Sequence, residues 1–101
     1  MVNMFYTYVL ESLKDHKKYI GSTGDLKSRF ERHNQGLVLS TKSRRPFKVI
    51  YFEKFDTLSE ARWRERSFKR SHDLLNRTML RAVKYGRRPR GPLARREGSV
   101  G

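Results

Sequence analysis

Two tyrosine-bearing runs separated by a short polar break constrain the fold of this chain more than any other feature. Residues 5–10 are apolar or aromatic almost throughout, and residues 17–22 form a second strand-like run after the polar stretch at 12–16. Aromatic and β-branched residues are typical of strands, and two such runs joined by a few polar residues are typical of a hairpin. We therefore expect two antiparallel strands at the start of the domain.

The register of this hairpin decides which side chains meet. A turn centred near residues 13–14 places Tyr8 opposite Tyr19. The same register places Tyr6 opposite Gly21. Side chains that lie opposite one another on paired antiparallel strands share a face of the sheet. Two phenols are therefore expected on one surface.

Helices and a third strand are expected after the hairpin. Small and capping residues at 23–25 precede a helix that begins at Leu26 and stops near Gly36. A strand at 47–55 follows a basic loop, and two further helices lead to Gly86. These elements predict an α+β domain, with a small three-stranded antiparallel sheet and flanking helices in the order β-β-α-β-α-α.

The second helix carries a carboxylate on its apolar side. Thr57 and Glu60 have the spacing of a capping box, which predicts where this helix begins. One stripe, at helical spacing, holds Leu58, Ala61, Glu65 and Phe68. A free charge is costly to bury, so Glu65 needs a partner. That partner is either Arg62 or Lys69, one turn away, or a metal ion.

Charge and composition narrow the classes of partner. The chain has 24 Lys and Arg against 10 Asp and Glu, a net charge of +14, which favours a polyanion such as nucleic acid. A membrane partner is not expected, because the sequence has no apolar span of about 20 residues. The lack of cysteine excludes disulfides and cysteine-ligated zinc. The first residues lack the features of a signal peptide, so a cytoplasmic protein is expected.

Two residues on the first helix are candidates for phosphate chemistry. Arg29 and His33 lie one turn apart, so both project from the same side. The residue types alone favour a solvated arginine and a capping or packing histidine. A guanidinium also suits the extra negative charge of a pentavalent phosphorus.

These residues together resemble the GIY-YIG nuclease domain, and in length and order the small stand-alone bacterial members. Tyr19-Ile20-Gly21 matches one family tripeptide in full, whereas Tyr6-Thr7-Tyr8 matches only the tyrosine of Gly-Ile-Tyr. Arg29 lies eight residues after Gly21, within the interval where the family places its arginine. The resemblance covers about residues 5–85.

The resemblance implies a set of catalytic residues. Arg29 would stabilise the phosphate, and His33 matches a position that holds histidine or tyrosine. Glu65 would be the single protein ligand of a divalent cation, Mg²⁺ or Mn²⁺. Tyr8 and Tyr19 would orient the attacking water and hydrogen-bond the phosphate, in either order. The full predicted catalytic set is Tyr8, Tyr19, Arg29, His33 and Glu65.

Other residues receive a structural interpretation. Tyr6 and Tyr51 are expected to be strand aromatics in a small core. Ser22 stands where some family members have a lysine that is proposed as the base, which argues against a lysine-base mechanism here. The expected apolar side of the last helix consists of Leu74, Leu75, Met79, Leu80 and Val83.

The function that this resemblance implies is that of a metal-dependent endonuclease that hydrolyses DNA phosphodiester bonds, with structure selectivity as one option. The alternative is a DNA- or RNA-binding protein that keeps the fold with little or no catalysis. DNA is favoured over RNA as the partner, although phosphate contacts do not distinguish the two. Specialised members of the family carry a second domain that selects the target, so a partner protein could supply that selection here.

The last residues form a separate, basic segment. Residues 87–101 contain five arginines against one glutamate and only isolated aliphatic residues. Such a composition cannot offset the entropy of ordering a chain. We therefore expect a GIY-YIG-like domain at residues 1–86 and a disordered basic tail at residues 87–101.

Overall fold

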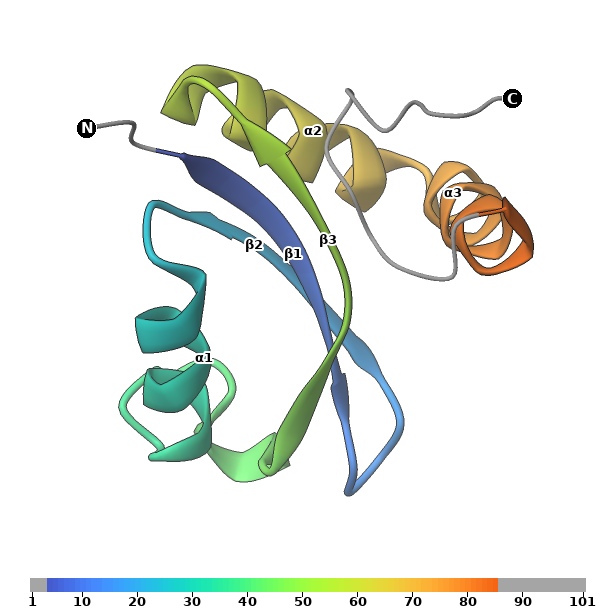
Figure 1. Cartoon of the computed structure of the whole chain (residues 1–101). Coiled ribbons are helices and arrows are strands. Elements are labelled where there is room, and N and C mark those ends of the chain that lie inside the picture. The colour runs from blue at the N-terminus through green and yellow to red at the C-terminus, as the bar shows by residue number, and fades with distance from the viewer. Residues whose placement is uncertain (1–3, 86–101) are drawn as a thin grey trace.

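The protein is a curved three-stranded sheet with helices on both faces (Figure 1). A computed structural model describes residues 4–85. The elements, in chain order, are β1 (Phe5–Ser12), β2 (Lys18–Thr23), α1 (Leu26–Asn34), a short 3-10 helix (Lys42–Arg44), β3 (Phe47–Phe55), α2 (Leu58–Arg70) and α3 (His72–Tyr85). The strands are antiparallel and lie in the order β2-β1-β3. The predicted α+β class and the order β-β-α-β-α-α are confirmed.

The hairpin register differs from the predicted one by two residues. Tyr8 pairs with Gly21, and Leu10 pairs with Tyr19. The cause is a longer turn, which is closed by a hydrogen bond from the Ser12 amide to the Lys17 carbonyl at 2.9 Å. A shift of two residues keeps every side chain on its original face. The two phenols therefore still share a surface, with ring centroids 6.4 Å apart.

Local sequence signals set the ends of the helices. The Asp25 carboxylate accepts a hydrogen bond from the Ser28 amide and caps α1. Gly36, with φ of 79°, follows the end of α1 in the left-handed region that glycine tolerates best. The predicted capping box of Thr57 and Glu60 is present at the start of α2. Each of these signals was readable from the sequence.

The sheet separates two apolar clusters. Val9, Ile20 and Tyr51 face α2 and α3, where they pack with Phe68 and Leu75. Tyr8, Leu10 and Phe47 face the other side, where partly buried side chains complete the cluster: Tyr19, Leu26, Phe30, Val49 and Phe52. Figure 1 shows α1 on this second face and α2 across the first. Alternation along β1 thus sends neighbouring residues to different chemical surroundings.

One expectation for the last helix was wrong in part. The predicted apolar side of α3 packs through Leu74, Leu75 and Met79, but Leu80 and Val83 are 67% and 66% exposed. Within residues 4–85, neither residue belongs to an apolar cluster. On α2, the guanidinium of Arg64 turns toward Glu53 on β3.

Some predictions concern residues that the structure does not cover. The boundary at residue 86 and the basic tail at 87–101 lie outside residues 4–85, so both stay predictions. Within residues 4–85, no helix is long and apolar enough to span a bilayer. The cytoplasmic location stays a prediction from the sequence.

Candidate active site

A buried chain of hydrogen bonds joins Tyr8 on β1 to His33 on α1. The Tyr8 hydroxyl lies 3.0 Å from His33 Nε2, and His33 Nδ1 lies 2.8 Å from the Thr41 hydroxyl. Exposure is 2% for Tyr8 and 0% for His33 and Thr41. Thr41 donates its own proton to the Val38 carbonyl, so it accepts from His33. This pattern assigns the proton of His33 to Nδ1 and makes Nε2 the acceptor for Tyr8.

The titration behaviour of this pair agrees with that assignment. Burial, and then the positive charge of Arg29, lower the pKa of His33 from 6.5 to about 4. Burial, and then Tyr19, raise the pKa of Tyr8 above its usual value of 10.0. Both groups are therefore neutral near pH 7. The Tyr8 proton is committed to His33, so this phenol is a poor general base.

Gly21 is the residue that makes room for Tyr8. A Cβ at this position would lie 2.5 Å from the Tyr8 hydroxyl oxygen and 2.6 Å from Cζ. The two residues are paired across β1 and β2, so neither can shift independently. The glycine of the Tyr19-Ile20-Gly21 tripeptide is therefore explained by the close approach of a phenol.

Tyr19 and Arg29 form the more accessible part of the cluster. The Tyr19 ring lies 4.9 Å from the His33 ring, centroid to centroid, and the residue is only partly buried. Arg29 is also partly buried, and it is close enough to lower the pKa of both Tyr8 and His33. Within residues 4–85, neither side chain forms an ion pair or a side-chain hydrogen bond. Both are therefore available to a ligand.

Glu65 reaches the same region from α2. Its Oε1 accepts a hydrogen bond from the Ser22 hydroxyl at 2.6 Å, and its Oε2 contacts the Lys69 ammonium at 2.6 Å. The side chain of Glu65 is 21% exposed and that of Lys69 is 52% exposed. The negative charge of Glu65 contributes to the raised pKa of Tyr8, so the carboxylate lies close enough to Tyr8 to influence its titration. The ion pair with Lys69, one of the two sequence interpretations, is present.

The donor set at Glu65 fits a hydrated divalent cation held by one carboxylate. Within residues 4–85, no group of three or more His, Asp or Glu side chains is placed to enclose a metal. Magnesium does not need such a cage, because it keeps most of its waters and accepts one carboxylate with substrate oxygens. Lys69 is half exposed and can turn to solvent, and the Ser22 hydroxyl can hydrogen-bond a metal-bound water. Glu65 therefore stays the candidate ligand.

A second carboxylate beside α2 was missed by the sequence analysis. Glu53 on β3 is 7% exposed and accepts two hydrogen bonds from Arg64, at 2.7 and 3.1 Å. The Tyr51 hydroxyl donates a third at 2.5 Å. The signal available was a glutamate inside the otherwise apolar run at 47–55. Tyr51 is buried in the core, as predicted, whereas Tyr6 is only partly buried.

Comparisons with known proteins identify relatives along most of the described chain. Residues 4–77 match the family model of the GIY-YIG catalytic domain. A UPF0213 protein of Listeria welshimeri is 46% identical over 69 residues, which cover 67% of this chain and 76% of the relative. A UPF0213 protein of Pediococcus pentosaceus is 46% identical over 70 residues, which cover 68% and 73%.

A solved structure is also similar. It is the solution NMR structure of the UPF0213 protein BH0048 from Bacillus halodurans, with 30% identity and a TM-score of 0.47 over 82% of this chain and 87% of that one. The family match covers both tyrosine tripeptides, α1 and the Glu65 position. The chain therefore belongs to the GIY-YIG domain family, a nuclease superfamily, and within it to the small bacterial proteins named UPF0213.

Proposed function

We propose that this protein is a divalent-metal-dependent endonuclease that hydrolyses phosphodiester bonds of DNA. The observation that carries the proposal is the convergence of Tyr8, Tyr19, Arg29, His33 and Glu65 from four elements. The charges of Arg29 and Glu65 both act on the Tyr8 hydroxyl. A cation, a carboxylate and a phenol thus meet beside one partly open surface, which is what phosphoryl chemistry needs.

The residues divide into those that contact substrate and those that hold them in place. Arg29 would donate to the non-bridging oxygens of the scissile phosphate, where negative charge develops. Tyr19, which is partly exposed, would align the attacking water or the phosphate. Tyr8 and His33 are buried and hydrogen-bonded to one another, so we assign them the role of positioning Tyr19.

Hydrolysis adds water across one phosphorus–oxygen bond. The water oxygen bonds to phosphorus, the bond to the 3′ oxygen breaks, and the leaving oxygen takes up a proton. When bound at Glu65, a magnesium or manganese ion would supply positive charge to the phosphate and to that leaving oxygen. With one carboxylate in the site, a single-metal scheme is preferred to a two-metal one.

One observation favours the alternative, a nucleic-acid-binding protein with little catalysis. Lys69 forms a 2.6 Å contact with Glu65 and would compete with a metal ion for that oxygen. Arg29 and the net charge of +14 would serve RNA or DNA binding equally well. Target selection by a partner protein, and an electrostatic contribution from residues 87–101, are compatible with either function.

The test is a cleavage survey with the full chain. Labelled branched, single-stranded and duplex DNA, and a matched RNA, are incubated with Mg²⁺, with Mn²⁺ and with chelator. We expect cleavage of at least one DNA with metal and none with chelator. Binding without cleavage of every substrate would reject the endonuclease and support the alternative.

A matched pair of arginines on α1 sharpens this survey. Arg29→Ala should lower both affinity and cleavage rate, because the guanidinium contacts the scissile phosphate. Arg32→Ala removes the same charge from an exposed position, so it should lower affinity only slightly and leave the single-turnover rate unchanged. Equal losses in the two variants would place Arg29 outside the site.

A further inference from the structure

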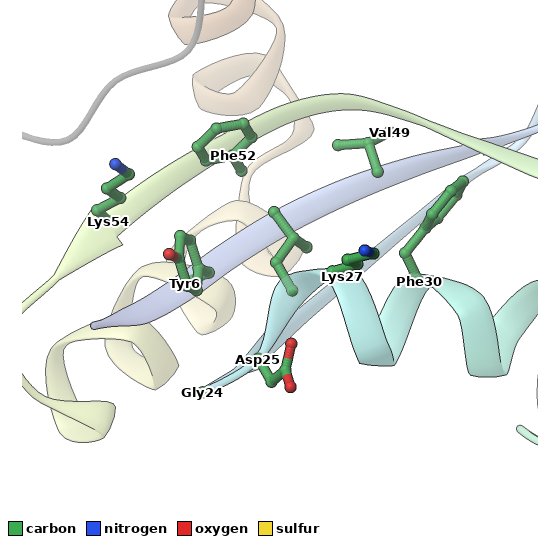
Figure 2. Close-up of a pocket in the computed structure, with 9 residues that line it drawn as sticks. Tyr6, Gly24, Asp25, Lys27, Phe30, Val49, Phe52 and Lys54 are labelled. Atoms are coloured by element: carbon green, nitrogen blue, oxygen red, sulfur yellow. The ribbon is translucent and has the colours of Figure 1, made fainter. Parts of the chain in front are cut away.

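A groove lined by aromatic and basic side chains lies on the α1 face of the sheet. Its volume is about 490 Å³, within the range of about 300–1,000 Å³ typical of small-ligand sites. Figure 2 shows Tyr6 on β1 and Phe52 on β3 beside one another, with Phe30 and Lys27 contributed by α1. None of the predicted catalytic residues lines it. The groove is therefore a separate feature that the proposed reaction does not explain.

Tyr6 contributes an aromatic ring to this groove. It stands where the family tripeptide has glycine, so the sequence adds a ring at this position. Tyr6 and Phe52 meet edge to face, with centroids 6.0 Å apart and planes at 69°. In an edge-to-face pair, one ring contacts its neighbour only through its edge, so both faces of that ring stay free of the neighbouring ring. Both residues are only partly buried, so a flat ligand can stack there.

The charge around the groove favours an anion beside that flat group. Lys54 lies opposite Tyr6 across β1 and β3, and Lys27 lies on the first turn of α1. Both lysines are exposed, and within residues 4–85 neither forms an ion pair. Asp25 also lines the groove, but its carboxylate is engaged by the Ser28 amide. An aromatic platform flanked by cations is the arrangement that binds unpaired nucleotides.

The groove also lies next to the candidate active site. Tyr6 and Tyr8 are two residues apart on β1, so their side chains share the α1 face about 7 Å apart. Phe30 follows Arg29 on α1. A nucleic-acid strand whose phosphate lies at Arg29 can thus extend a neighbouring nucleotide into the groove.

We infer that the groove of Tyr6, Phe52, Lys27 and Lys54 binds an unpaired nucleotide adjacent to the cleaved phosphate. Its base stacks on the aromatic pair, and its phosphate lies by the lysines. The inference rests on the proposed nuclease function for the location of that phosphate. The substrate is then a nucleic acid with a single-stranded or unpaired segment, because bases in an intact duplex have no free faces.

Binding without metal tests the groove separately from cleavage. Single-stranded oligonucleotides, intact or with one abasic position moved along the strand, are titrated with the full chain in chelator. We expect one abasic position to weaken binding roughly 5- to 150-fold, the effect of losing one stacked base. 2-Aminopurine at that position should be quenched on binding.

Three variants test whether the difference in affinity between intact and abasic strands depends on the ring of Tyr6. Tyr6→Phe should keep the difference between intact and abasic strands. Tyr6→Leu, which preserves apolar packing on Phe52, should remove it without changing the melting temperature. Trp63→Ala removes another aromatic, 62% exposed on α2, and should leave the difference unchanged.

Three outcomes would overturn the inference. These are equal affinity for intact and abasic strands, an unchanged difference in Tyr6→Leu, and loss of the difference in Trp63→Ala instead. The last would place the stacking platform on α2. Base-dependent binding without cleavage of any substrate would reject the proposed nuclease function and keep the groove as a nucleotide site. Cleavage that does not depend on the abasic position would reject the groove and keep the nuclease function.

Discussion

Two glutamates, Glu53 on β3 and Glu65 on α2, have very different partners. Glu53 is 7% exposed and is held by two hydrogen bonds from Arg64 and one from Tyr51. Glu65 is 21% exposed in its side chain, with one bond from Ser22 and one from Lys69, which is itself half exposed. A planar guanidinium fixes a carboxylate, whereas a flexible ammonium can leave it. The carboxylate of Glu53 is therefore closed to other ligands, whereas the carboxylate of Glu65 can replace Lys69 with another ligand.

The largest loss of stability should follow from removing the charge of Glu53, whose carboxylate is closed to other ligands. Glu53→Gln leaves the guanidinium of Arg64 without its charged partner, which costs about 3–5 kcal/mol of unfolding free energy. Glu65→Gln should cost less than about 1 kcal/mol, because its partners remain solvated. Urea unfolding of both variants measures the difference. Equal stability losses would show that the two carboxylates are structurally equivalent.

The next largest effect should be a loss of stability at acidic pH, caused by protonation of His33. The pKa of His33 is lowered from 6.5 in the unfolded chain to about 4, so the unfolded state binds more protons between these values. Stability should be full above about pH 6.5 and fall by roughly 2–3 kcal/mol as the pH drops to about 4.

The histidines supply their own control for this acid effect. His33→Gln should weaken the pH dependence in that window, whereas His72→Gln, at an exposed position, should retain it. The measurement is urea unfolding at a series of pH values. A slope that is the same in wild type and in His33→Gln would show that His33 is not the titrating group.

Removing single hydroxyls separates chemistry from packing. Tyr19→Phe should lower the single-turnover rate about 10- to 100-fold with little change in melting temperature. Tyr51→Phe should lower the unfolding free energy by about 1–2 kcal/mol and keep the rate. Tyr8→Phe should lower both, because it leaves His33 Nε2 without a donor. A wild-type rate in Tyr19→Phe would show that the Tyr19 hydroxyl takes no part in the reaction and that the ring serves only in packing.

The smallest effect is expected at Lys69. An exposed pair one helical turn apart contributes less than about 0.5 kcal/mol, so Lys69→Met should scarcely change stability. Loss of the competing ammonium should lower the magnesium concentration needed for half-maximal cleavage. A higher magnesium requirement in this variant would mean that Lys69 assists catalysis rather than competing with the ion.

Much of the fold was predictable because its signals are local. The Asp25 cap, the Thr57–Glu60 capping box and the alternation of β1 all depend on residues within a few positions of one another. The hairpin register failed by two residues because turn length depends on how residues 13–17 close, which composition does not specify.

The candidate site was predictable only in part. Tyr19, Arg29 and Glu65 were found from motif spacing, and the structure brings them to one region. The partners that set their chemistry were not found, because Thr41 and Ser22 are common residues whose contacts with His33 and Glu65 span distant segments. The closure of Glu53 by Arg64 was missed for the same reason: helical periodicity gave no sign that this arginine turns inward.

Single-turnover cleavage across a magnesium titration, with wild type and Glu65→Gln side by side, tests the central claim most directly. The substrate is the DNA that the survey shows to be cut best. The account predicts a rate at least about 100-fold below wild type at every magnesium concentration, with unchanged DNA affinity and a stability loss below about 1 kcal/mol. A Glu65→Gln protein that cleaves at the wild-type rate would contradict it, and would make Glu65 the partner of a structural ion pair.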